Sequence, residues 1–159
     1  MAFRSVGAAV HTANMNTIPL VMNAPAGYVA GDKLVAFLSE DHPVVDAANI
    51  TFTGWTLLGE INVTADGQNA LVYWRDATGS DNFTASTSTG ATMETTGFVG
   101  AWSGRELGVA PSVVSSQDNT AAASPLSVSL TGITAAQGDD IAAFVTIDQV
   151  AQTDTWTFS

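Results

Sequence analysis

The side chains that could act as the catalytic base of a serine nucleophile are few. The sequence holds two histidines, His11 and His42, so a Ser-His-Asp arrangement would need one of them. The stretch nearest to a nucleophile elbow is GAWSG at 100–104, but Ser103 stands one place off the G-x-S-x-G spacing and no helix is predicted after it. Fifteen acidic residues offer many possible pairs of carboxylates of the kind that a glycosidase uses. The sequence around these residues does not mark any pair as catalytic. We therefore expect no enzymatic activity.

The stretch DATGSDN at 76–82 is the best candidate for a calcium site, because Asp76, Asp81 and Asn82 surround a glycine. It lacks the alternating Asp or Asn ligands and the distal Glu of a calcium-binding loop. We interpret these acids as solvated turn residues, and we expect neither a metal nor another cofactor.

Exposed tryptophans could stack on sugar rings, as in carbohydrate-binding modules. The four tryptophans are Trp55, Trp74, Trp102 and Trp156. Trp74 and Trp102 each end an apolar run, ALVYW and FVGAW, which favours a place in the core with the indole N–H satisfied.

Charge restricts the partners of this protein. Four cations oppose fifteen acids, which gives a formal net charge of −11. Phosphate contacts need clustered Lys and Arg, so we expect neither nucleic acid nor an anionic membrane surface as a partner.

No apolar run approaches the ~20 residues of a membrane-spanning helix. No cysteine is present for a disulfide, a thiol nucleophile or a cysteine-bound zinc ion.

The elements that position these side chains are predicted to be strands. The 159 residues suffice for a single domain with its own core, and only 12% are charged. Runs of four to eight residues rich in Val, Ile, Phe, Trp and Thr alternate with Gly, Asn, Asp or Pro. The predicted strands are Phe3–Val10, Thr17–Asn23, Lys33–Ser39, Asn49–Phe52, Thr56–Val63, Ala70–Asp76, Asn82–Ser86, Thr96–Ser103, Ser112–Ser116, Pro125–Leu130, Asp140–Ile147 and Thr155–Phe158. This pattern predicts an all-β domain, a jelly roll or two-sheet β-sandwich over residues 1–159.

Three runs, LVAFL, ALVYW and IAAFV, are continuously apolar and indicate strands buried on both faces. We expect Phe37, Trp74, Trp102 and Phe144 to lie in the core.

Two distant stretches resemble each other. GDKLVAFLSED at 31–41 and GDDIAAFVTID at 138–148 share five of eleven positions. The likeness extends to about 6–53 and 113–159, which would suit an internal duplication into two Greek keys. The alternative is that two strands with similar surroundings converged on similar residues.

The first sixteen residues hold no acid in a strongly acidic chain. Such a segment could meet an acidic partner surface without repulsion, as an N-terminal arm or an edge strand. The alternative is a plain edge strand with a frayed end. The candidate shell or subunit contacts are Met1, Phe3, Arg4, Val6 and Val10.

Five motifs recur in the order of a known pattern: PAG, GDKLVAF, GWTL, VYWRDAT and AWSG. This order resembles a β-sandwich domain of tailed-bacteriophage virion proteins, also seen in bacterial surface proteins. Trp102 stands where that family usually has Tyr. The motifs are turn glycines and core aromatics, so the resemblance implies the fold more directly than the function.

The function that the resemblance implies is structural and lies on the surface of a phage head. We expect a capsid cement or decoration protein that binds the major capsid protein, as a homo-oligomer and most simply a trimer. The alternative is a tail or head fibre or adhesin domain that binds host-surface carbohydrate.

Overall fold

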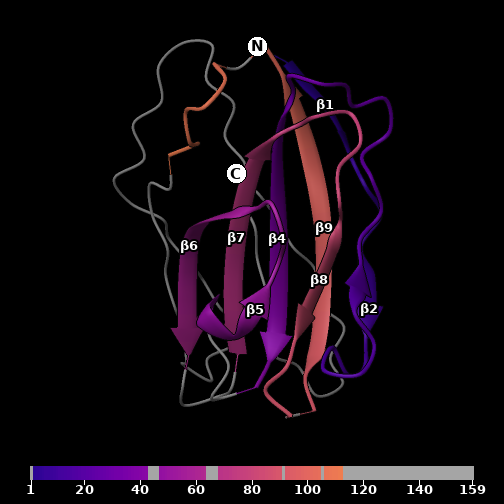
Figure 1. Ribbon diagram of the computed structural model, residues 1–159, viewed down its shortest axis with the longest axis vertical. Helices are drawn as coiled ribbons and strands as arrows, with labels where there is room; N and C mark the ends of the chain where they lie inside the picture. Colours follow the sequence, from indigo (N-terminus) through magenta and orange to yellow (C-terminus); the bar gives the residue numbers. More distant parts are fainter. Residues whose placement is uncertain (1, 43–46, 64–67, 91, 105, 113–159) are drawn as a thin grey trace, which may run out of the picture.

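The computed structural model of the protein describes residues 2–42, 47–63, 68–90, 92–104 and 106–112. This part of the chain folds as two antiparallel β-sheets that pack against each other (Figure 1). It contains no α-helix, and so no helix long and apolar enough to span a membrane. The predicted all-β sandwich of two sheets is therefore confirmed.

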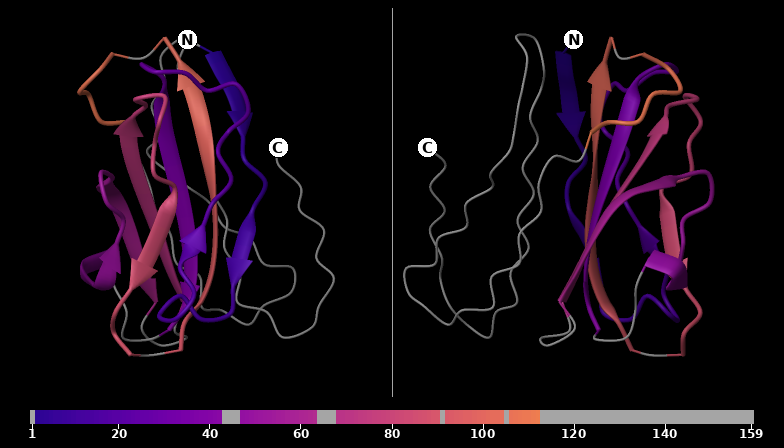
Figure 2. Two further views of the ribbon diagram at one scale, coloured as in Figure 1. Left: turned by 45° about the vertical axis from the view of Figure 1, so that its right-hand side comes forward. Right: turned by 90° about the vertical axis from the view of Figure 1, so that its left-hand side faces the viewer.

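The larger sheet has six strands and the smaller sheet has three. The larger sheet runs β1 (Ala2–Val6), β9 (Glu94–Ser103), β4 (Lys33–Asp41), β7 (Gln68–Asp76) and β6 (Thr56–Val63), and β2 (Val10–Thr12) also pairs with β9. The smaller sheet runs β3 (Leu20–Val21), β8 (Thr84–Thr87) and β5 (Ile50–Thr51), the last preceded by the short 3-10 turn η1 (Ala47–Asn49). The edge-on view in Figure 2 shows the smaller sheet against one face of the larger.

Each predicted strand up to Ser103 has an observed counterpart. Phe3–Val10 is divided into β1 and β2, and only two residues of Thr17–Asn23 pair as β3. The predicted strands after Ser112, the second copy of the duplication and Phe144 lie outside the described residues. Ser112 itself is not in a strand.

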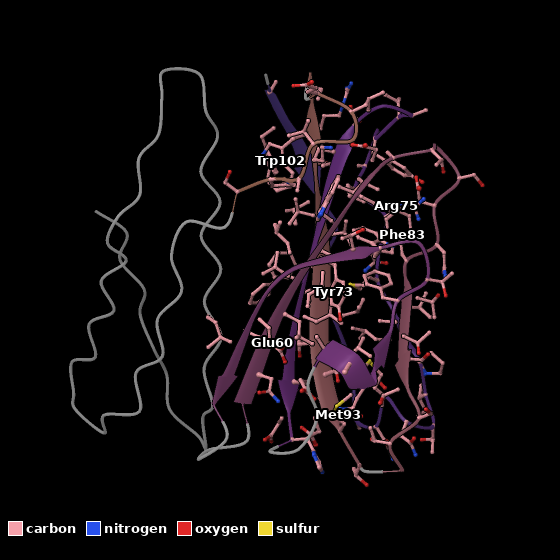
Figure 3. All side chains as sticks on the ribbon, turned by 60° about the vertical axis from the view of Figure 1, so that its left-hand side comes forward. Glu60, Tyr73, Arg75, Phe83, Met93 and Trp102 are labelled. Atoms are coloured by element: carbon pink, nitrogen blue, oxygen red, sulfur yellow. The ribbon has the colours of Figure 1, made fainter. Side chains whose placement is uncertain are left out.

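The core lies between the two sheets. Leu34, Ala36 and Leu38 of β4 alternate toward the smaller sheet, because successive side chains of a strand point to opposite faces. Tyr73 of β7 points the same way (Figure 3). The full set of buried hydrophobic residues in this core is Met15, Leu20, Met22, Leu34, Ala36, Leu38, Phe52, Trp55, Leu71, Tyr73, Ala77, Ala85, Met93, Val99 and Ala101.

The other face of the larger sheet is also apolar. Val35, Phe37 and Trp102 point away from the smaller sheet and are less than one-tenth exposed. Phe37 contacts Phe98 across the strands, with ring centroids 5.6 Å apart. The prediction that LVAFL is buried on both faces is therefore confirmed. Phe37 and Trp102 are buried, but on the second face and not between the sheets, while Trp74 on that face is half-buried.

The break between β1 and β2 has a local cause. The Gly7 N–H donates to the Val99 carbonyl at 2.8 Å, and the Asn23 side chain donates to the Ala8 carbonyl at 3.0 Å. A Cβ on Gly7 would collide with the Asn23 carbonyl oxygen. The chain segment leading from β3 therefore crosses so close to the edge strand that only glycine fits there.

A matched pair of leucines tests the position of the core. Leu71 is fully buried between the sheets, whereas Leu57 on β6 is 41% exposed. We expect Leu71→Ala to lower the free energy of unfolding by about 2–5 kcal/mol, because it removes buried methyl groups and leaves a cavity. Leu57→Ala should cost about 1 kcal/mol or less. Urea unfolding followed by tryptophan fluorescence measures both, and equal effects would contradict this core.

Candidate functional site

The predicted contact residues of the N-terminal segment are spread over β1 and β2. Phe3 and Val6 of β1 are 53% and 52% exposed, and the Arg4 side chain is 37% exposed. Val10 of β2 is half-buried and packs against the core. Met1 lies outside the described residues. The structure thus brings three of the five predicted residues together on one short exposed strand.

Strand β1 lies at one end of the larger sheet. Strand β1 pairs with β9 on one side, and no other described strand pairs with it. The register shifts between Phe3 and Ser5, which leaves Arg4 in a bulge. Unpaired backbone N–H and C=O groups at such an edge can accept a strand from another chain.

An aromatic contact holds Phe3 in place. Its ring meets Trp102 edge to face, with centroids 5.5 Å apart. The Trp102 ring in turn lies over Gly100, where a Cβ would come within 2.6 Å of the indole. Gly100 therefore leaves space for the Trp102 ring. Trp102 in turn packs against Phe3, which remains about half exposed.

The cations of the described chain are used internally. Arg4 Nε pairs with Asp32 at 2.7 Å, Lys33 with Asp76, and Arg75 with Asp81 at 2.9 Å. Lys33 also lies 4.4 Å from the centre of the Trp74 ring. All three pairs lie at one end of the sandwich, where β4 begins and β7 ends. The described residues therefore present no cluster of free cations to a phosphate backbone.

Asp76 joins this end of the sheet to the segment after β9. It accepts hydrogen bonds from Lys33 and, at 2.6 Å, from the Gly108 N–H. Burial raises the pKa of Asp76, but the Lys33 and Gly108 hydrogen bonds and the Lys33 charge outweigh it, so the pKa is lowered from its ordinary value.

The acidic turn at 76–82 is a closed structural unit. The Asp81 carboxylate is fully buried and pairs with Arg75. It also accepts hydrogen bonds from the Thr78 N–H at 3.0 Å and the Gly79 N–H at 3.1 Å. The interpretation of these acids as solvated is therefore wrong for Asp81, because the turn folds around its carboxylate. No group of three or more His, Asp or Glu side chains placed to hold a metal occurs among the described residues.

The two histidines do not meet the serine of GAWSG. Ser103 ends β9 and donates to the Ala2 carbonyl at 3.2 Å. His11 is opposite Thr96, seven residues earlier on β9, and its Nδ1 lies 3.4 Å from that hydroxyl. At roughly 3.3 Å per residue, the two ends are about 23 Å apart. His42 follows Asp41, which pairs with Glu94 at the same distant end.

Two of the three tryptophans in the described chain are buried. Trp55 is buried, stacks on Phe52 with centroids 4.5 Å apart, and donates from Nε1 to the Asn82 carbonyl at 2.8 Å. Trp102 is buried beside Phe3. Burial is thus confirmed for Trp55 and Trp102, whereas Trp74 is half-buried and Trp156 lies outside the described residues.

No protein-family model, curated protein or solved structure matches the chain. The likeness to phage virion domains rests on the five motifs of the sequence alone.

The structure also shows exposed residues at the opposite edge that sequence reasoning missed. Leu57 and Glu60 of β6 are both exposed. The register of β6 shifts between Leu57 and Gly59, so the strand does not keep a regular alternation. The hydrophobic pattern of TLLGEINV consequently gave no signal of which side chains face outward.

Acid titration tests the role of Asp76. Because its folded pKa is depressed, its contribution to stability is present above the unfolded aspartate pKa of about 3.9 and is lost as the pH falls through the folded pKa. We expect Asp76→Asn to be less stable than the parent protein at neutral pH, with the difference shrinking in acid. Urea unfolding over a pH series measures it, and a difference independent of pH would contradict this role.

Replacement of Asp81 tests the closed turn. Asp81→Asn should lower the free energy of unfolding by about 1–3 kcal/mol, because Arg75 loses its charged partner in a buried setting. Asp41 is exposed at the end of β4, and Asp41→Asn is the matched control with a small expected effect. Thermal unfolding with and without EDTA completes the test. A large fall in the midpoint caused by the chelator would show that this turn holds a metal.

Proposed function

We propose that this chain is a non-enzymatic structural protein of a virus particle, which decorates and stabilises the head of a tailed phage. It would bind the major capsid protein as a homo-oligomer, with a trimer as the simplest closed form. The observation that carries this proposal is strand β1, which pairs with β9 alone among the described strands and on which Phe3 and Val6 remain half-exposed. It lies in the acid-free segment of a chain of net charge −11.

Two further features support a binding role over a catalytic one. Two polar side chains of the candidate sites are engaged in structural contacts: Ser103 with Ala2, and Asp81 with Arg75. The buried tryptophans give little support to the alternative of a glycan-binding adhesin, because Trp55 and Trp102 offer no exposed stacking face.

The N-terminal segment cannot simply be deleted to test this proposal. Strands β1 and β2 pair with β9, and Met15 is fully buried in the core. Loss of the first sixteen residues would therefore damage the fold together with the surface. Point substitutions of exposed side chains separate the two effects.

The test is cosedimentation with phage shells that lack this protein. The variant with Phe3→Ser and Val6→Ser should bind with a stoichiometry at least several-fold lower than the parent protein. The matched control carries Ile18→Ser and Val21→Ser, which change two residues that are 60% and 63% exposed in and beside the smaller sheet. The control should bind as the parent does.

Two outcomes would contradict the proposal. Unchanged decoration by the β1 variant, with its fold confirmed by thermal unfolding, would place the contact elsewhere. An intact protein that never binds shells but is retained on a glycan column would replace the decoration role with the adhesin role.

A further inference from the structure

We infer that residues 113–159 of this chain cover the outer face of the larger sheet, so that this sheet is enclosed on both sides. The outer face is the face that points away from the smaller sheet, and Val35, Phe37 and Trp102 lie on it. The inference goes beyond the proposed function and does not depend on it. It assigns the outer face to a segment of the same chain and so removes that face as a docking surface for a capsid or a glycan.

Two phenylalanines on the outer face differ in exposure. Phe3 of β1 is opposite Trp102, and Phe37 of β4 is opposite Phe98, so both rings point to this face. Phe3 is 53% exposed, whereas Phe37 is 6% and Val35 is 8% exposed. Because side chains stand roughly perpendicular to a sheet, Phe98 covers Phe37 only from the side. The tips of Phe37 and Val35 are therefore covered by a part of the chain that lies above the sheet.

The described strands do not supply this cover. The smaller sheet lies against the other face (Figure 2), and the core that it encloses there includes neither Val35 nor Phe37. The described segment that follows β9, residues 106–112, does not supply it either, because its Leu107 and Val109 are 61% and 51% exposed.

The parts of the chain outside the described residues differ in reach. Residues 43–46 and 64–67 each extend over at most about 14 Å. The first follows the end of β4 and leads to Ala47, which packs against the core on the opposite side, and the second joins β6 to its neighbour β7. Val35 lies about 20 Å along β4 from Asp41, at roughly 3.3 Å per residue. Only the segment 113–159 is long enough to cover the middle of the sheet.

The sequence of this segment suits a covering layer. In LSVSL at 126–130, Leu and Val alternate with Ser, which gives a strand one apolar face for the sheet and one polar face for water. GDDIAAFVTID at 138–148 adds Ile141 and Phe144 in a pattern that resembles the sequence of β4. A segment of this length has too little interior to bury these side chains by itself. The apolar segment and the apolar outer face therefore each need the other.

The same chain is also a better occupant of the outer face than a second copy. Val35 and Phe37 are already buried in a single chain, with no neighbouring copy present. Two copies of net charge −11 repel each other. The segment also starts close to the sheet, because the Gly108 N–H donates to Asp76 at the end of β7.

Photo-cross-linking in the full chain identifies the occupant. The variant is Phe98→p-benzoylphenylalanine, which keeps an aromatic ring at a half-buried position of the outer face. The control carries the same residue in place of Val21, which is 63% exposed on β3 of the smaller sheet. Both variants are first shown to unfold near the parent's temperature. After irradiation, the cross-linked peptides are mapped by mass spectrometry.

The inference predicts a cross-link within one chain, from position 98 to a peptide of 113–159, at a yield at least several-fold above the control. A cross-link between two chains would show that a second copy covers the face and would overturn the inference. Cross-links to the described residues alone, or none above the control, would overturn it as well.

Cysteine labelling measures the cover independently, since the chain has no cysteine of its own. Val35→Cys should react with a maleimide at least several-fold more slowly than Val21→Cys, and this protection should persist on dilution because the cover belongs to the same molecule. Equal labelling rates would show an uncovered face, and protection lost on dilution would show a second copy. Neither result bears on the shell-binding test, which uses the exposed Phe3 and Val6.

Discussion

The burial of β4 on both faces is the constraint on which the rest of the fold depends. Its residues between Leu34 and Leu38 are shielded from solvent on either side, and both neighbours, β7 and β9, pair with it along its whole length. Each end of the strand nevertheless carries a buried charged group, Lys33 and Glu40. The β7 residues directly opposite are Asp76, which pairs with Lys33, and Asn69, whose amide donates to Glu40 at 2.6 Å. A shift of one residue would separate both pairs and leave buried charge uncompensated, so the polar ends fix the register of the apolar middle.

Much of the sheet structure could be predicted because local patterns of apolar and turn residues indicate it. Thr56–Val63 was predicted at its observed bounds, and the apolar runs around Phe37 and Trp74 correctly indicated interior strands. The predictions were least accurate where pairing depends on distant residues. The edge strand is divided at Gly7 because Asn23 crosses it, and β3 is short because only two of its residues reach β8. Neither fact can be read from the segment itself.

The candidate site was predictable in position but not in its contacts. The acid-free composition singled out the N-terminal segment, and the structure places Phe3, Arg4 and Val6 on an exposed edge. The partners of these residues come from elsewhere in the chain: Trp102 supports Phe3, and Asp32 pairs with Arg4. The same applies to Asp81, which looked like a solvated turn acid until Arg75 was brought beside it. A contact between two side chains that are far apart in the sequence leaves no recognisable pattern in the residues around either one.

An open two-sheet sandwich must protect its edges from indiscriminate pairing, and this one does so in two ways. The smaller sheet ends in β3 and β5, two residues each, which are too short to recruit a foreign strand. The larger sheet ends in β1 and β6, which are long enough to pair, and both carry a register shift, beside Arg4 in one strand and Gly59 in the other. A bulge shortens the stretch of regular backbone available to a partner, so the charge and shape of side chains weigh more in the choice of partner. At the β1 edge the charge of Arg4 is compensated within the chain by Asp32. Short strands at the ends of one sheet and bulges at the ends of the other thus limit the regular backbone that the described edges offer to a foreign strand.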